Sequence, residues 1–280
     1  MDSRLLMKRN LRCSCLLFLL VITLGSVPVT GCGTLKNGQG WGENALYPLD
    51  LKRIPHAAYT ALLDPKTLIP AAGALVFTGN DFDEKVSSWA AKHNPIFGSK
   101  ENAANASDYL LNTLYAETIL TAFATPSGDD PENWIYWKTK GIAVELIALG
   151  ATEGATDLLK NATSRTRPDG SDNKSFPSSH SSSSFCSATL ANRNLNSIPL
   201  SDPVRIPLQV GNILLATSVA WARVEAQKHF PSDALVGAAL GNFLGAFIHD
   251  AFLGLPQDNG FSFTVFPLKG GARAEFYFAF

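Results

Sequence analysis

Three clusters of polar residues within one stretch, residues 160–233, constrain most strongly what this chain can form. The clusters are Lys160 to Arg167-Pro168, then Pro177-Ser178-Ser179-His180, then Arg223, His229 and Asp233. Small apolar residues and turn formers separate the charged residues, so the stretch is not a solvated charge run. The polar side chains of the three clusters are therefore expected to converge on one site.

Lys160, Arg167 and Arg223 are three cations that can surround one ligand. A multiply charged anion is the ligand that such a group favours, and phosphate is the commonest example. Ser178 also has the position of a helix N-cap before an apolar segment. The free N–H groups and the positive dipole end of such a helix bind anions as well. The residues together predict a phosphate site.

Two histidines lie beside expected helix starts in the same stretch. His180 follows Ser178, and His229 precedes a second expected helix that starts near Ser232. One imidazole can attack phosphorus while the other protonates the leaving oxygen. Asp233 lies four residues after His229 and is expected to hold its ring and support the developing positive charge. Because the cations would supply the electrostatic stabilisation, no metal and no other cofactor is expected.

The order of these residues resembles the signature of the type 2 phosphatidic acid phosphatase (PAP2) superfamily. That superfamily includes lipid phosphatases, bacterial non-specific acid phosphatases and vanadium haloperoxidases. The resemblance implies that His229 is a nucleophile forming a phosphohistidine, that Asp233 orients it, and that His180 is the general acid. It implies that the phosphate oxygens are held by Lys160, Arg167, Ser178, Ser179 and Arg223.

Two positions depart from that signature. Ser179 stands where a glycine is usual, and Ala222 stands where a serine is usual before the motif arginine. Ser179 can still offer its backbone N–H to a phosphate, whereas Ala222 loses a possible hydroxyl contact. We expect both changes to affect substrate range and rate more than the type of reaction.

Residues 1–31 have the pattern of a bacterial lipoprotein signal peptide. Basic residues come first, an apolar run from Leu16 to Val29 follows, and Thr30-Gly31-Cys32 resembles the end of a lipobox. Lipidation of Cys32 is therefore predicted, and the alternatives are an ordinary signal peptide or an uncleaved anchor. Gly33 favours the outer membrane by resemblance to the sorting rule. We expect a protein of the bacterial cell envelope that faces the periplasm as an outer-membrane lipoprotein.

The remaining chain divides into three parts. Residues 32–55 are rich in Gly, Asn and Pro and are interpreted as a tether, and residues 56–255 have the periodicity of a helical PAP2-like phosphatase domain. Residues 256–280 alternate in polarity, which predicts a β-hairpin. The expected fold class is all-α, a PAP2-like helical bundle with a short C-terminal hairpin. The apolar segments 205–223 and 232–252 are interpreted as core helices, because they fall short of a clear membrane span.

The predicted function is that of a metal-independent phosphatase acting on phosphate monoesters or pyrophosphates, with a lipid phosphate as the expected substrate. The expected contact with a membrane is an N-terminal lipid anchor. Two alternatives stay open: a broad-specificity periplasmic acid phosphatase acting on soluble esters, and a non-catalytic lipoprotein that binds phospholipid. A net charge of −1 argues neither for nor against a charged partner, and no nucleic-acid partner is expected.

Overall fold

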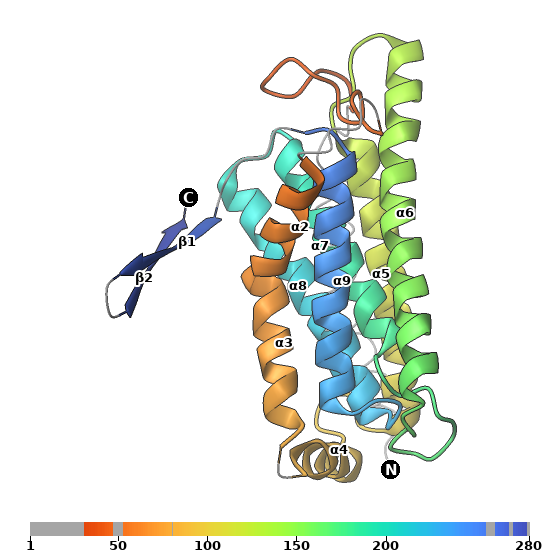
Figure 1. Cartoon of the computed structure of the whole chain (residues 1–280). Coiled ribbons are helices and arrows are strands. Elements are labelled where there is room, and N and C mark those ends of the chain that lie inside the picture. Colours follow the sequence, from red (N-terminus) through yellow and green to blue (C-terminus); the bar gives the residue numbers. More distant parts are fainter. Residues whose placement is uncertain (1–30, 47–52, 80, 256–260, 269–270, 279–280) are drawn as a thin grey trace.

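A computed structural model of the chain describes residues 31–46, 53–79, 81–255, 261–268 and 271–278. Within these residues, eight α-helices pack into a bundle and two strands pair near the C-terminus (Figure 1). The predicted signal peptide lies almost wholly outside the described residues. The elements are α2 (Arg53–Leu63), α3 (Pro65–Phe77), α4 (Phe82–His93), α5 (Lys100–Ala124), α6 (Pro131–Thr163), α7 (Ser179–Ser197), α8 (Asp202–Glu225), α9 (Pro231–Phe252), β1 (Phe261–Leu268) and β2 (Gly271–Phe278).

Side-chain caps determine where several helices begin. Asp64, Ser99 and Ser178 each accept a hydrogen bond from a backbone N–H in the first turn of α3, α5 and α7. Helix α5 begins at Lys100, well before the apolar residues Leu110, Leu111 and Leu114 that recur at helical spacing. The reason is that the Ser99 cap starts two polar turns that carry no apolar periodicity. These extra turns matter because they extend α5 toward the polar clusters.

Helices α7 and α9 form the centre of the bundle, and both are mostly buried. Their backbones approach closely along a row of glycines on α9, of which Gly237, Gly241 and Gly245 face α7. A Cβ atom at Gly241 would overlap the carbonyl oxygen of Ser182, and one at Gly237 would lie 2.6 Å from the carbonyl oxygen of Ser178. Only glycine permits this approach. The contact places the N-termini of α7 and α9 side by side, and with them the second and third polar clusters.

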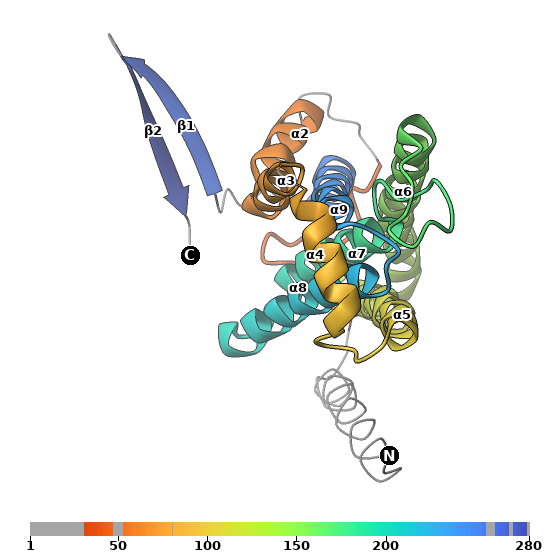
Figure 2. The ribbon, with the colours of Figure 1, turned by 90° about the horizontal axis from the view of Figure 1, so that it is seen from below.

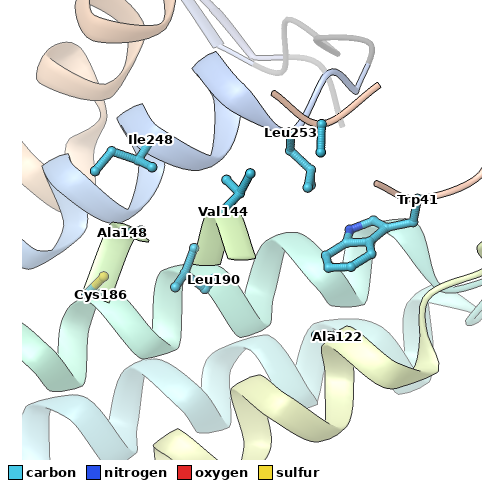
Figure 3. Close-up of a cluster of buried hydrophobic side chains, with 9 residues drawn as sticks. Trp41, Ala122, Val144, Ala148, Cys186, Leu190, Ile248 and Leu253 are labelled. Carbon is cyan, nitrogen blue, oxygen red and sulfur yellow. The ribbon is translucent and has the colours of Figure 1, made fainter. Parts of the chain in front are cut away.

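The largest apolar core cluster joins α5, α6, α7, α9 and the segment 31–46 (Figure 3). Trp41 is fully buried in it, and a Cβ atom on Gly141 of α6 would collide with the Trp41 ring. The ammonium of Lys138 lies 5.0 Å from the centre of that ring. Residues 32–46 of the predicted tether therefore pack onto the bundle.

The alternating segment at the C-terminus forms an antiparallel pair of strands. β1 pairs with β2 in a register that sets Phe261 opposite Phe278 and Leu268 opposite Gly271. The sheet has these two strands within the described residues. Two strands expose both of their edges unless other parts of the chain or a partner cover them.

The two ends of the bundle are far apart and carry different groups. At one end, Trp134 Nε1 near the start of α6 donates a hydrogen bond of 2.7 Å to the carbonyl oxygen of Gly31. Lys160 lies on the same helix, and its position corresponds to about 39 Å further along the axis. Figure 1 places the segment 31–46 at the top and α4 at the bottom, and Figure 2 shows α4 lying across the lower end. We call this lower end, with α4 and residues 164–178, the α4 end.

Candidate active site

Three cationic side chains converge on His229 at the α4 end. Lys160 comes from the last turn of α6, Arg167 from the loop that follows, and Arg223 from the last turn of α8. Burial and the charges of Arg223, Lys160 and Arg167 hold the pKa of His229 well below its ordinary value. Burial, followed by the charge of Arg167, likewise lowers the pKa of Lys160 to about 8. The cations of the first and third predicted clusters are thus brought together.

The charges of these cations are only partly compensated. Arg167 Nε lies 2.6 Å from the exposed carboxylate of Asp172, whereas Lys160 Nζ donates to two backbone carbonyl oxygens. Arg223 Nη1 donates to Ser107 Oγ at 3.1 Å, and its buried Nε has no partner among the described residues. Burying cations without counter-charge is costly, so the group is suited to bind an anion.

His229 has one ring nitrogen fixed and the other directed at the cations. Its Nδ1 lies 2.6 Å from the backbone carbonyl oxygen of Ser175. Because a carbonyl only accepts, Nδ1 carries the proton and Nε2 keeps a lone pair. Nε2 lies 3.3 Å from Arg167 Nη1, and the residue is 1% exposed. A lone pair beside clustered cations can attack the phosphorus of a bound phosphate.

The expected contact of Asp233 with the ring of His229 is not present, which corrects the sequence-based expectation. The carboxylate accepts hydrogen bonds from Ser175 Oγ at 2.5 Å, Phe230 N at 2.8 Å and Arg165 Nη1 at 2.7 Å. The physical reason is that Asp233 caps its own helix by turning back to Phe230. Since the Ser175 carbonyl holds His229, Asp233 can position that ring through Ser175.

Arg165 is a residue of the site that the sequence analysis missed. Its guanidinium joins two carboxylates, Asp233 and Asp83 of α4, the latter at 2.9 Å, and it lies 4.2 Å from the ring centre of Phe230. Asp83 also accepts a 2.8 Å bond from the backbone N–H of Ser232, which ties α4 to the start of α9. Arg165 was visible as a second arginine inside the first cluster. Asp83 lies far away along the chain, and only the fold brings it here.

Replacing Arg165 with alanine is expected to lower the free energy of unfolding by about 1–3 kcal/mol, because it leaves two buried carboxylates short of a donor. Lysine should restore little of this loss, since an ammonium lacks the planar fork that reaches both carboxylates. Thermal unfolding would measure the effect. The matched control is Arg205→Ala, which removes an exposed pair with Asp202 and should change stability by no more than about 0.5 kcal/mol. Equal effects of the two alanine variants would contradict this account.

His180 lies in the first turn of α7 and faces the same cations. Burial lowers the pKa of His180 and the charge of Arg223 lowers it further, whereas the carboxylate of Asp108 raises it. His180 Nε2 lies 2.7 Å from Asp108 Oδ1. The imidazole is about one quarter exposed, with a side-chain accessibility of 26%. A histidine at the rim of a group of cations is placed to exchange protons with a bound phosphate ester.

The N-terminus of α7 completes the anion site. Ser178 Oγ accepts from a backbone N–H of the first turn, as the sequence predicted. Among the described residues, the N–H groups of Ser179 and His180 have no hydrogen-bond partner, so they can bind an anion. Among the residues that the structure describes, no three or more His, Cys, Asp or Glu side chains form a group that could hold a metal ion.

Cys32 is not part of this arrangement. It is exposed and adjoins Gly31, which contacts α6 at the end of the bundle opposite to α4. The catalytic and phosphate-binding residues predicted from the sequence gather at the α4 end, and the predicted lipidation site lies at the other end.

Residues 142–254 match the model of the PAP2 superfamily. A lipid A 1-phosphatase of Porphyromonas gingivalis is 29% identical over 107 residues, which cover 38% of this chain and 22% of that protein. The matched part is thus about one fifth of that relative's length. The fold is similar to the crystal structure of a transmembrane PAP2-type phosphatidylglycerolphosphate phosphatase from Bacillus subtilis. That likeness has a TM-score of 0.50 at 22% identity and covers 69% of this chain and 94% of the other.

Proposed function

We propose, from the PAP2 superfamily domain that residues 142–254 form, that this protein is a metal-independent phosphatase that acts on lipid phosphates. Its substrates would be phosphate monoesters or pyrophosphates, and its intermediate a phosphohistidine at His229. The observation that carries the proposal is the Nε2 lone pair of His229, which faces Arg167 while Nδ1 is held by a carbonyl. The similarity to two phosphatases supports a phosphatase.

In the first step, Lys160, Arg167 and Arg223 hold the phosphate oxygens and neutralise the charge that develops on them. His229 Nε2 attacks phosphorus, and a new P–N bond forms while the bond to the leaving oxygen breaks. His180 donates its proton to that oxygen, so the alcohol or phosphate leaves neutralised. The Ser175 carbonyl accepts from Nδ1 throughout and stabilises the charged ring.

In the second step, a water molecule replaces the leaving group. His180, now neutral, takes a proton from the water as its oxygen attacks phosphorus. The P–N bond breaks, inorganic phosphate leaves, and His229 returns to its neutral form. Each histidine ends the cycle in its initial state, so the reaction needs no other reactant than water.

Exposed apolar side chains on the outer faces of the bundle support a lipid substrate. Leu75 and Val76 of α3 are 75% and 67% exposed, and Leu158 of α6 and Leu214 of α8 are 73% and 61% exposed. No Asp, Glu, Lys or Arg interrupts residues 206–222 of α8, a length of about 25 Å. Soluble monomers rarely expose large apolar patches. We infer that these faces contact lipid acyl chains, which brings the site to lipid head groups.

The most apolar helix does not belong to those faces. Among the described residues, α9 alone has the length and hydropathy of a possible membrane span, and 56% of its most apolar window is buried inside the bundle. The sequence-based interpretation of the segment 232–252 as a core helix fits this central position. Helix α8 packs against α5 and α7, with Ala216 and Val219 in a core cluster. Its outer side chains Ile206 and Val210 are 51% and 49% exposed.

A lipid anchor on Cys32 would not by itself bring the candidate active site to the membrane. It would hold the end of the bundle that lies about 39 Å along α6 from Lys160, and not the α4 end. We propose that the protein lies in the bacterial cell envelope and, within it, at the outer membrane. Contact with the lipid substrate would then depend on the apolar faces of the bundle.

The test is phosphate release by the purified full-length protein in detergent, with EDTA present. The substrates are a short-chain phosphatidate, a lipid pyrophosphate and an aryl phosphate of similar charge, each compared by kcat/KM. We expect release from all three in EDTA, with the lipid substrates preferred by at least about tenfold, or about 1.4 kcal/mol. A preference for the aryl phosphate would favour a broad acid phosphatase. Absence of release from every substrate would reject the phosphatase.

A further inference from the structure

Helix α5 supplies two adjacent side chains to the site, although it lies outside the segment that matches the family model. Ser107 Oγ accepts a 3.1 Å hydrogen bond from Arg223 Nη1 and is fully buried. Asp108 Oδ1 lies 2.7 Å from His180 Nε2. One residue thus contacts a cation of the anion site, and the next contacts the candidate general acid.

Ser107 is oriented toward Arg223 by its own hydrogen bond. Its hydroxyl donates to the carbonyl oxygen of Ala104 at 2.6 Å, so the oxygen lone pairs are left for the arginine. Ser107 is also the hydrogen-bond partner of the Arg223 guanidinium among the described residues. A hydroxyl that can only accept here orients the guanidinium without neutralising it, which keeps the charge available to an anion.

Asp108 changes the charge around His180, whereas Ser107 leaves the charge of Arg223 unchanged, because Asp108 brings a negative charge. Charged groups face His180 from three elements: Arg223 of α8, Arg167 of the loop after α6, and Asp108 of α5. Burial and the two arginines disfavour a protonated imidazole and lower the pKa of His180, and Asp108 offsets part of that effect. With Nε2 bound to Asp108, Nδ1 is left to deliver a proton, and it has no hydrogen-bond partner among the described residues.

We propose that Asp108 is a positioning residue that orients His180 and favours its protonated form for donation to the leaving oxygen, and that Ser107 orients Arg223 toward the phosphate. This inference rests on the proposed function. The two residues of α5 then have separate roles: Asp108 promotes the departure of the leaving group, and Ser107 promotes phosphate binding. Because each residue acts through another, neither is expected to touch the phosphorus.

These separate roles predict that the effect of replacing Asp108 on kcat depends on the leaving group of the substrate. An alkoxide leaves poorly and needs a proton, whereas p-nitrophenolate leaves readily without one. Asp108→Asn should therefore lower kcat for a short-chain phosphatidate by about 10- to 100-fold. Its kcat for p-nitrophenyl phosphate should stay within about threefold of the wild type. Ser107→Ala should instead raise KM for both substrates by a similar factor.

The pH profile gives a readout that a structural defect would not produce. His180 donates only while protonated, so kcat for the phosphatidate falls as pH rises through the pKa of His180. Removing the Asp108 charge lowers that pKa, and the alkaline limb should move to lower pH. Glu101→Gln is the matched control, because Glu101 is an exposed carboxylate on the same helix. It should leave both the rates and the profile unchanged.

NMR titration of His180, assigned with His180→Gln, keeps the proposal testable even if the wild type hydrolyses neither substrate. A lower pKa of His180 in Asp108→Asn but not in Glu101→Gln is expected. The proposal would be overturned by an unchanged titration, or by equal loss of kcat on both substrates with an unmoved alkaline limb. An inactive wild type that shows the expected titration would instead contradict the phosphatase and the catalytic part of the proposal, leaving the ion pair itself established.

Discussion

Replacing His229 with alanine is expected to abolish phosphate release, with a fall in kcat of at least about 10³-fold. The reason is that Nε2 is the unprotonated ring nitrogen and lies among the clustered cations, and alanine offers no group that can attack phosphorus. The measurement is phosphate release from a short-chain phosphatidate by wild type and variant under identical detergent conditions. Retention of more than about a tenth of the wild-type rate would exclude His229 as the nucleophile.

The control for this variant is His56→Ala. His56 is exposed on α2 and takes no part in the site, so its replacement should leave kcat and KM unchanged. The wild type should also carry phosphate on the protein after an alkaline quench during turnover, and His229→Ala should carry none. Labelling of the variant at the wild-type level would place the intermediate on another residue.

Phosphate binding separates a catalyst from a pure lipid-binding protein. His229→Ala keeps Lys160, Arg167 and Arg223, so its affinity for inorganic phosphate should remain within about tenfold of the wild type. Burial and these cations lower the pKa of His229 in the free protein, so its ring stays neutral at about pH 6.5 and above. The acid limb of kcat/KM that belongs to this histidine is therefore expected below that pH.

The sequence could predict the role of a residue where that role depends only on residues close to it along the chain. Ser178 caps α7 as predicted, because a serine before a helical segment satisfies free N–H groups regardless of the remaining fold. Lys160 and Arg223 lie in the last turns of α6 and α8, and His229 lies just before α9, so the three residues meet where these helix ends gather at the α4 end. Their residue types beside expected helix ends selected these residues, and the resemblance to the PAP2 superfamily implied their roles.

The supporting residues could not be predicted in the same way. Asp83, Ser107 and Asp108 come from α4 and α5, and nothing in their local sequence distinguishes them from solvated polar residues. The partners of Asp233 also depend on side-chain direction: a spacing of four residues permits contact with His229, but the carboxylate turns back to Phe230 instead. Such choices are made by packing between elements, which a linear pattern does not contain.

Hydropathy was similarly ambiguous for the outer helices. An apolar segment can face a protein core or lipid, and both environments favour the same residues. Helix α9 is central and carries the glycines that contact α7, whereas α8 exposes Ile206, Val210 and Leu214. Only the three-dimensional arrangement shows which side chains of these apolar helices are buried and which are exposed.

Replacing Gly241 with alanine is expected to be the most damaging small change in the bundle. The added Cβ would overlap the backbone carbonyl oxygen of Ser182, which cannot move without separating α7 from α9. Overpacking of this kind costs about 1–3 kcal/mol and sometimes more, which exceeds the gain of up to about 1 kcal/mol from better helix propensity. We expect a fall in the free energy of unfolding of about 2 kcal/mol or more, measured by denaturant unfolding in detergent.

The matched control is Gly154→Ala on α6, where an added Cβ has no atom within 4 Å. That change should raise the free energy of unfolding by about 0.5–1 kcal/mol, so the same substitution has opposite signs at the two positions. Because Gly241 sets the distance between the start of α7 and α9, its variant should also lose activity while still folded. A stable and fully active Gly241→Ala would show that α7 and α9 can separate without disturbing His180 and His229.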